Sequence, residues 1–272
     1  MEHIVNPIAL QTVLLPGVTL DEKLAAARAV GADGVELQVS PEFYAQLPEL
    51  TRGLARHGLR AAALRVGPTR LIHPEYGERE RALVEMRHAL AASADLNAAG
   101  VVFYGHYASH SVLPDLHPYK SPVELEAELL VTELRATLCD LAYALGANLL
   151  LAHADSSTSA LLRSPQHAAV IRAKLDNHPH IFVATSTSHL DAEHIDVTQS
   201  LATPGLGYFA VTDMNGRLPG QGSRDWQMLG AAIQTSSYEG WLTIEGHSPE
   251  GLDALKAAVQ VLREALAQKP PD

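Results

Sequence analysis

The chain has 272 residues, of which 47% are hydrophobic and 19% charged, a composition typical of an ordinary folded protein. Its formal net charge of −11 opposes binding to a phosphate backbone, because nucleic-acid binders gain affinity from clustered Lys and Arg. The single cysteine, Cys139, excludes an internal disulfide, and no long apolar run indicates a membrane span. Since MEHIVNPIAL lacks the pattern of a secretion signal, we expect a cytoplasmic protein that binds neither nucleic acid nor membrane.

A strand-like apolar run followed by a helical pattern recurs along the whole chain, about eight times. This alternation is typical of a parallel barrel, and the length is close to the ~250 residues of that fold. No linker rich in Ser, Gly and Pro divides the sequence. We therefore expect residues 1–272 to form one α/β domain, a (β/α)8 TIM barrel.

In the first half of the chain, four strands alternate with three helices. Strands are expected at residues 7–15, 33–39, 59–66 and 100–105, and helices at 19–31, 41–56 and 77–97. Thr19 and Glu22 have the spacing of a capping box, and Gly58 is a suitable left-handed helix terminator. Residues 105–121 are long for a barrel loop, since most such loops have ~2 to 6 residues, and we expect them to cover an active site.

The second half continues the same alternation. Strands are expected at 147–153, 180–186, 207–211 and 240–246, and helices at 122–145, 157–175, 190–201 and 249–267, with a further loop and helix after residue 211. Barrel strands are covered on both faces, and continuous apolar runs such as VVFY and NLLLA meet that demand.

Chemistry in such barrels lies at the carboxyl ends of the strands, where the loops to the following helices begin. That rule selects the polar residues Glu36, Gln38, Arg65, Tyr104, His106, His153, Asp155, Ser186, His189, Asp213, Glu245 and His247.

The stretch from Gly207 to His247 carries the most specific motifs. Asp213, the loop Pro219-Gly-Gln-Gly, Trp226 and Glu245 resemble the end of the xylose isomerase-like TIM barrels, which include sugar isomerases, epimerases and endonuclease IV. The resemblance implies that fold, and an enzyme that moves a proton on a small sugar-like substrate.

Members of that family usually bind a divalent metal (Mn, Mg or Zn type) through a Glu, an Asp, a His and a Glu on the last four strands. The matching positions here are Ala152, Ser186, Ala210 and Glu245. Alanine offers no donor atom, and a neutral hydroxyl is a poor ligand compared with a carboxylate. We therefore expect the usual metal to be absent, assign no metal ligand and assign no other cofactor.

Fourteen histidines leave open a relocated metal site, for example from His106, His110, His117 and His153. No pair has the HExxH spacing that fixes ligand geometry, so hydrogen-bonded or surface histidines are the interpretation we favour.

Four residues are candidates for catalysis. Glu245, at the mouth of the last strand, can act as an acid or base, or can pair with Arg65 as a structural acid. His153 and His189 can move a proton above the barrel, and Asp213 can bind a sugar hydroxyl or shape a turn. The candidates for substrate binding are Glu36, Arg65, Tyr104, His106, Trp226 and His247.

Two functions from different classes follow. One is a sugar isomerase, epimerase or related lyase acting on a small polyhydroxylated or keto-acid substrate without the usual metal. The alternative is a non-catalytic barrel that binds a sugar or another ligand, because fold does not determine function. A DNA-repair endonuclease is disfavoured by the acidic charge and by Tyr104, where such families commonly have His. Assembly into a homo-oligomer stays open.

Overall fold

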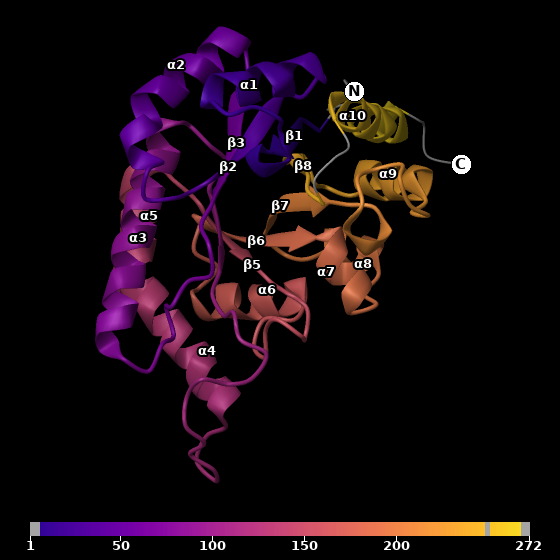
Figure 1. The fold of residues 1–272 in the computed structure, drawn as a ribbon. Coiled ribbons are helices and arrows are strands. Elements are labelled where there is room, and N and C mark those ends of the chain that lie inside the picture. The colour runs from indigo at the N-terminus through magenta and orange to yellow at the C-terminus, as the bar shows by residue number, and fades with distance from the viewer. Residues whose placement is uncertain (1–5, 248–250, 268–272) are drawn as a thin grey trace.

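Eight parallel strands close into a barrel in the computed structural model, which describes residues 6–247 and 251–267. The strand order follows the chain, and β1 pairs with both β2 and β8 (Figure 1). The strands are β1 Ile8–Gln11, β2 Gly34–Gln38, β3 Arg60–Arg65, β4 Val101–Tyr104, β5 Leu149–Ala152, β6 Ile181–Ser186, β7 Leu206–Val211 and β8 Leu242–Ile244. The predicted (β/α)8 barrel is confirmed.

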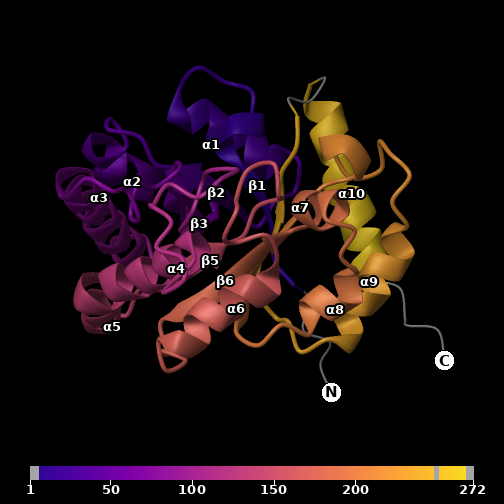
Figure 2. The ribbon, with the colours of Figure 1, turned by 90° about the horizontal axis from the view of Figure 1, so that it is seen from below.

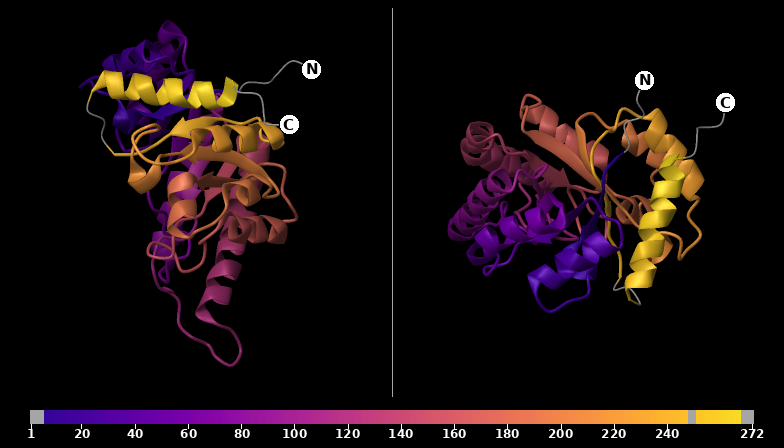
Figure 3. Two further views of the ribbon diagram at one scale, coloured as in Figure 1. Left: turned by 90° about the vertical axis from the view of Figure 1, so that its right-hand side faces the viewer. Right: turned by 90° about the horizontal axis from the view of Figure 1, so that it is seen from above.

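Helices surround the strands when the molecule is viewed from below or from above (Figure 2; Figure 3, right). They are α1 Leu20–Ala29, α2 Leu47–His57, α3 Tyr76–Asp95, α4 Pro122–Glu133, α5 Cys139–Leu145, α6 Pro165–Lys174, α7 Thr187–Ala192, α8 Val197–Leu201, α9 Trp226–Thr235 and α10 Leu252–Ala267. Short helical turns are η1 Thr12–Leu14, η2 Tyr44–Gln46, η3 Leu134–Leu138 and η4 Met214–Gly216. None of the described helices is both long and apolar enough to cross a lipid bilayer.

Two predicted helix ends are confirmed in detail. The Thr19 side chain accepts a hydrogen bond from the Glu22 amide, and the Glu22 carboxylate accepts one from the Thr19 amide, which closes the capping box of α1. Gly58 ends α2 with φ of 63°, a left-handed conformation that favours glycine.

Several predicted boundaries were wrong. β1 ends at Gln11 and gives way to η1, and α6 begins only at Pro165, where Ser164 caps the helix. The single helix expected at 190–201 is two short helices, of which α7 follows β6 without a loop because Ser186 caps it. The expected start of the last helix, at Pro249, lies outside the described residues.

The long segment 105–121 extends past the body of the barrel beside α4, and its tip points away from the strands (Figure 1; Figure 3, left). Its middle is held by Glu126 on α4, a fully buried carboxylate that accepts hydrogen bonds from the amides of Val112 and Leu113. The beginning of this segment directly follows Tyr104, the last residue of β4.

The barrel interior combines many small side chains with a few large ones. Its buried residues are Ala9, Ala62, Ala63, Val102, Leu150, Ala152, Ala184, Tyr208 and Trp241. Leucine, isoleucine and valine instead fill the layer between the strands and the surrounding helices. The barrel therefore has little aliphatic bulk at its centre, where polar groups of β2, β3 and β7 meet.

Packing between α9 and α10 gives a test of the fold. A Cβ atom added at Gly230 on α9 would lie 2.1 Å from the carbonyl oxygen of Ala265 on α10. We expect Gly230→Ala to lower the free energy of unfolding by about 2 to 3 kcal/mol, measured by urea denaturation, because the two helices must separate. Gly77→Ala on α3 is the matched control: nothing lies within 4 Å of its added Cβ, and we expect no loss of stability. Equal urea midpoints for Gly230→Ala and the wild type would contradict this packing.

Candidate functional site

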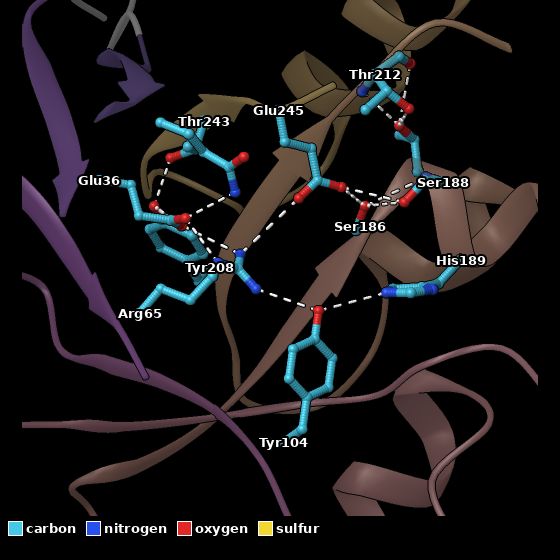
Figure 4. Close-up of polar contacts among 12 residues, drawn as sticks. Glu36, Arg65, Tyr104, Ser186, Ser188, His189, Tyr208, Thr212, Thr243 and Glu245 are labelled. Carbon is cyan, nitrogen blue, oxygen red and sulfur yellow. Dashed lines mark hydrogen bonds and ion pairs between the residues drawn. The ribbon is translucent and has the colours of Figure 1, made fainter. Parts of the chain in front are cut away.

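A buried carboxylate, Glu36 on β2, lies at the centre of a polar network inside the barrel (Figure 4). Its side chain is 2% exposed and accepts hydrogen bonds from Gln11 Nε2 and from the Tyr208 hydroxyl, both at 2.8 Å. Arg65 Nε and a terminal guanidinium nitrogen of Arg65 donate to its two oxygens at 2.6 and 3.1 Å. Glu36 therefore fixes the guanidinium through two hydrogen bonds.

Arg65, the last residue of β3, directs the rest of its guanidinium toward the barrel mouth. Burial lowers its pKa, but Glu36, Tyr104 and Glu245 outweigh that effect, so its pKa lies well above the ordinary value and the group stays charged. One terminal nitrogen donates to the Tyr104 hydroxyl at 3.2 Å, and the other lies 3.9 Å from Glu245 Oε2. The Arg65 guanidinium thus lies next to both the Tyr104 hydroxyl and the Glu245 carboxylate.

Glu245 follows the last residue of β8, and its side chain is 14% exposed. Its Oε1 accepts hydrogen bonds from the hydroxyls of Ser186 and Ser188, the latter at 3.1 Å. Ser186 ends β6, and Ser188 lies in the first turn of α7. The direct junction of β6 and α7 therefore places two hydroxyl donors on this carboxylate.

His189, also in the first turn of α7, joins the network through Tyr104. Its Nε2 lies 3.4 Å from the Tyr104 hydroxyl and its Nδ1 lies 3.1 Å from Asp155 Oδ2. Arginine can only donate, so the phenol oxygen accepts from Arg65 and its proton points to His189 Nε2, while Nδ1–H donates to Asp155. This is the tautomer of a histidine base oriented by a carboxylate.

The acid–base states agree with that assignment. Burial raises the pKa of Tyr104 to about 12, so the phenol keeps its proton at neutral pH. Burial also raises the pKa of Asp155, but hydrogen bonds from Ser157 and His189 outweigh it and the net pKa is lowered, which leaves an ionised carboxylate. Tyr104 is therefore a donor and Asp155 an acceptor.

His153, which directly follows β5, lies beside His189 with 5.8 Å between ring centroids. It is 1% exposed, and its Nε2 lies 2.7 Å from the Thr185 hydroxyl. Burial lowers its pKa to about 3, so the ring is neutral under ordinary conditions. His153 is therefore a buried, uncharged neighbour of His189.

Asp213, in the loop after β7, contacts Trp226, the first residue of α9. Asp213 is fully buried and accepts from the amides of Met214, Gly220 and Arg224 at 2.7 to 3.0 Å. Its Oδ2 also accepts from the Trp226 indole at 3.0 Å. These contacts hold the loop after β7 against the start of α9, so Asp213 and Trp226 support the structure outside the polar network of Glu36 and Arg65.

His106 and His247 also have partners outside the network. His106 is 1% exposed, with Nδ1 3.0 Å from the Ser159 hydroxyl and Nε2 3.4 Å from Glu126 Oε2. His247 is exposed and donates from Nδ1 to the carbonyl of Gly216 at 2.7 Å. Of the sequence-predicted site, the structure thus brings together Glu36, Arg65, Tyr104, His153, His189 and Glu245.

Sequence reasoning missed several members of the site. Asp155 and Ser186 were noted at strand ends but not chosen, although they orient His189 and Glu245. Tyr208 and Gln11, which hold Glu36, were not noted at all. The alternation of inward and outward residues along β1 and β7 was the available signal, because it separates the barrel interior from the helix-facing side.

The family's metal positions do not fit a divalent ion in this chain. Ala152 ends β5, and Ser186 pairs in register with Ala210. The fourth position, Glu245, accepts from two serine hydroxyls and lies near the Arg65 cation. Hard cations need several oxygen or imidazole ligands. Among residues 6–247 and 251–267, no group of three or more His, Cys, Asp or Glu side chains is arranged to hold a metal.

The chain belongs to the xylose isomerase-like TIM barrel family, whose family model matches residues 24–265. Comparison with functionally curated proteins found no match.

Solved structures share the fold at low sequence identity. 3-Keto-D-glucoside 4-epimerase from E. coli has a TM-score of 0.84 at 20% identity, covering 95% of this chain and 99% of that chain. D-Psicose 3-epimerase from Clostridium cellulolyticum has a TM-score of 0.80 at 17% identity, covering 96% and 99%. D-Allulose 3-epimerase from Methylomonas sp. has a TM-score of 0.79 at 17% identity, covering 96% and 98%. These structural neighbours are keto-sugar epimerases, and the likeness establishes the fold.

The buried ring of His153 makes stability depend on pH. Below the ordinary histidine pKa of 6.5, the unfolded chain binds a proton that the folded ring, with a pKa of about 3, does not bind. Stability is therefore lost as pH falls from 6.5 toward 3. We expect the wild type to lose about 1 kcal/mol more unfolding free energy than His153→Gln between roughly pH 7 and pH 5.5, measured by urea denaturation. The exposed His110→Gln should behave as the wild type, and identical pH slopes for all three proteins would refute the assignment.

Asp213 gives a second test, which separates loop support from catalysis. We expect Asp213→Ala to lower unfolding free energy by about 2 to 4 kcal/mol, because one buried and three partly buried donors lose their acceptor. Trp226→Phe, which removes a single donor and keeps the packing, should cost about 1 kcal/mol. Urea denaturation measures both, and a fully stable Asp213→Ala would show that these bonds do not hold the loop.

Proposed function

We propose that the protein is a sugar isomerase or epimerase that moves a proton beside the carbonyl of a small polyhydroxylated or keto-acid substrate, without the family's usual divalent metal. The observation that carries the proposal is the convergence of two acid–base groups, Glu245 and the His189–Asp155 pair, on Arg65 and Tyr104. They lie at the carboxyl ends of the strands, where such barrels perform chemistry. The family and its epimerase neighbours support the same reaction class.

The proposed reaction is a proton transfer between two acid–base groups on opposite faces of one substrate carbon. The Glu245 carboxylate takes the proton from the carbon beside the carbonyl, and the C–H electron pair becomes a C=C bond while the carbonyl oxygen becomes an oxyanion. His189, as an imidazolium with Nδ1–H bound to Asp155, returns its Nε2 proton to the opposite face of the carbon; the C=C electron pair forms the new C–H bond, and the oxyanion becomes the carbonyl again. The configuration at that carbon is inverted. In reverse, neutral His189 is the base and protonated Glu245 the acid.

A non-catalytic ligand-binding barrel is the second candidate. It is favoured by the two serine hydroxyls on Glu245, since Oε1 already accepts two hydrogen bonds and has no free lone pair to take a proton from a substrate. In that case the same polar groups would bind sugar hydroxyls without moving a proton.

The proposed function also includes a cellular location, a domain organisation and a class of partner. We place the protein in the cytoplasm as one domain over residues 1–272, acting on a small molecule and not on nucleic acid. A homo-oligomer is compatible with this function, since every proposed site residue comes from one chain.

The test is deuterium exchange. We expect EDTA-treated wild-type protein to incorporate deuterium from D2O into one or more members of a panel of ketoses and keto acids, measured by NMR. Glu245→Gln should slow exchange by about 10²-fold or more and His189→Gln by at least about 10-fold, since each removes an acid–base group. The exposed Glu85→Gln on α3 is the matched control and should exchange as the wild type. Ligand binding in thermal-shift assays without any exchange would favour the non-catalytic barrel, and exchange that requires added Mn²⁺ or Mg²⁺ would refute metal independence.

A further inference from the structure

We infer that Arg65 is a catalytic residue that binds the anionic oxygen of the substrate, so that a fixed guanidinium supplies the positive charge for the reaction. The inference rests on the proposed function and names the ligand chemistry of the site: a planar oxyanion, such as the enediolate formed when a proton leaves the carbon beside a carbonyl.

The first support is the way the guanidinium is held. Two of its nitrogens are bound to Glu36 at 2.6 and 3.1 Å, which fixes the plane of the group (Figure 4). The side chain is 13% exposed, so the cation lies mostly out of water but is still reachable from the mouth. A charge held in this way does not need to reorganise when an anion forms beside it.

The second support is the set of hydrogen bonds that fixes Glu36 itself. Gln11 on β1 and Tyr208 on β7 donate to Glu36, and the Tyr208 hydroxyl also lies 2.5 Å from the Thr243 hydroxyl on β8. Four different strands therefore determine where the Arg65 guanidinium lies. Glu36 is a positioning residue, because it acts on the substrate only through Arg65.

The third support is the balance of charge. Glu36, Arg65 and Glu245 together carry one net negative charge, and Glu245 lies 3.9 Å from the guanidinium, beyond hydrogen-bond distance. When Glu245 takes a proton, its charge disappears and an equal charge forms on the substrate oxygen. Arg65 then exchanges one anionic neighbour for another, and the net charge of the site does not change. A divalent ion is not needed to balance the oxyanion.

Binding of oxalate, a planar anion with the geometry of an enediolate, tests the inference without turnover. We expect EDTA-treated wild type to bind oxalate in isothermal titration calorimetry and Arg65→Met to bind at least about 10-fold more weakly, because a charged donor is lost. Glu245→Gln should bind oxalate about 3-fold or more tightly, since a like charge beside the anion is removed. Arg56→Met, at an exposed ion pair on α2, is the matched control and should bind as the wild type.

Removing Arg65 alone leaves Glu36 buried without its cation, and this can prevent folding. The double variant Arg65→Met with Glu36→Gln removes both charges; we expect it to fold, as judged by circular dichroism, and to bind oxalate as weakly as Arg65→Met.

In the deuterium-exchange assay, the kcat of Arg65→Ala should fall by about 10²-fold with KM changed less, and added ethylguanidinium should restore part of kcat. A merely structural loss would not show this split and rescue.

The outcomes separate the two proposals. Wild type that does not bind oxalate, or a folded Arg65→Met or double variant that binds it within twofold of wild type, would overturn the role of Arg65 regardless of the exchange assay. Glu245→Gln that exchanges protons at the wild-type rate would overturn the proposed function, while loss of oxalate binding in Arg65→Met would still support the anion site.

Discussion

The buried ion pair between Glu36 and Arg65 is the interaction on which the site depends. Taking two charges out of water is costly, and removing one partner of such a pair typically costs about 3 to 5 kcal/mol because the other is left uncompensated. Hydrogen bonds from Gln11 and Tyr208 satisfy the remaining lone pairs of Glu36. With the pair in place, Tyr104 has a donor, His189 has a defined tautomer and Glu245 has a cation nearby.

This chain keeps the family's barrel with a different set of polar groups in its mouth. Ala152 and Ala210 have no donor atoms, and their small side chains belong to strands that pack tightly. The hydroxyls of Ser186 and Ser188 instead donate hydrogen bonds to Glu245 and stabilise its charge. The fold thus determines where side chains meet, while the residue types at those points determine whether a metal or a guanidinium can supply positive charge.

The alternation of apolar runs and helical patterns was sufficient to predict the barrel, because both periods are local properties of the sequence. The rule that chemistry lies at strand ends also selected Glu36, Arg65, Tyr104, His189 and Glu245, which the structure brings together. It could not separate these from Asp213 and His106, whose partners include loop residues and residues of α9 and α4 that no strand-end rule locates. Tyr208 was missed because an inward tyrosine in an apolar strand gives the same signal as a core aromatic.

The hydrogen-bond chain from Arg65 through Tyr104 to His189 has a direction, and this has a consequence for the phenol. While His189 is neutral, its Nε2 accepts a hydrogen bond from the Tyr104 hydroxyl. Once His189 is an imidazolium, Nε2 carries a hydrogen and can no longer accept a hydrogen bond from the Tyr104 hydroxyl. The hydrogen of the Tyr104 hydroxyl must then rotate toward another acceptor. Protonation of His189 would therefore free the Tyr104 hydroxyl to donate a hydrogen bond to an oxygen of a bound ligand. The protonation state of His189 would then affect that oxygen without direct contact between them.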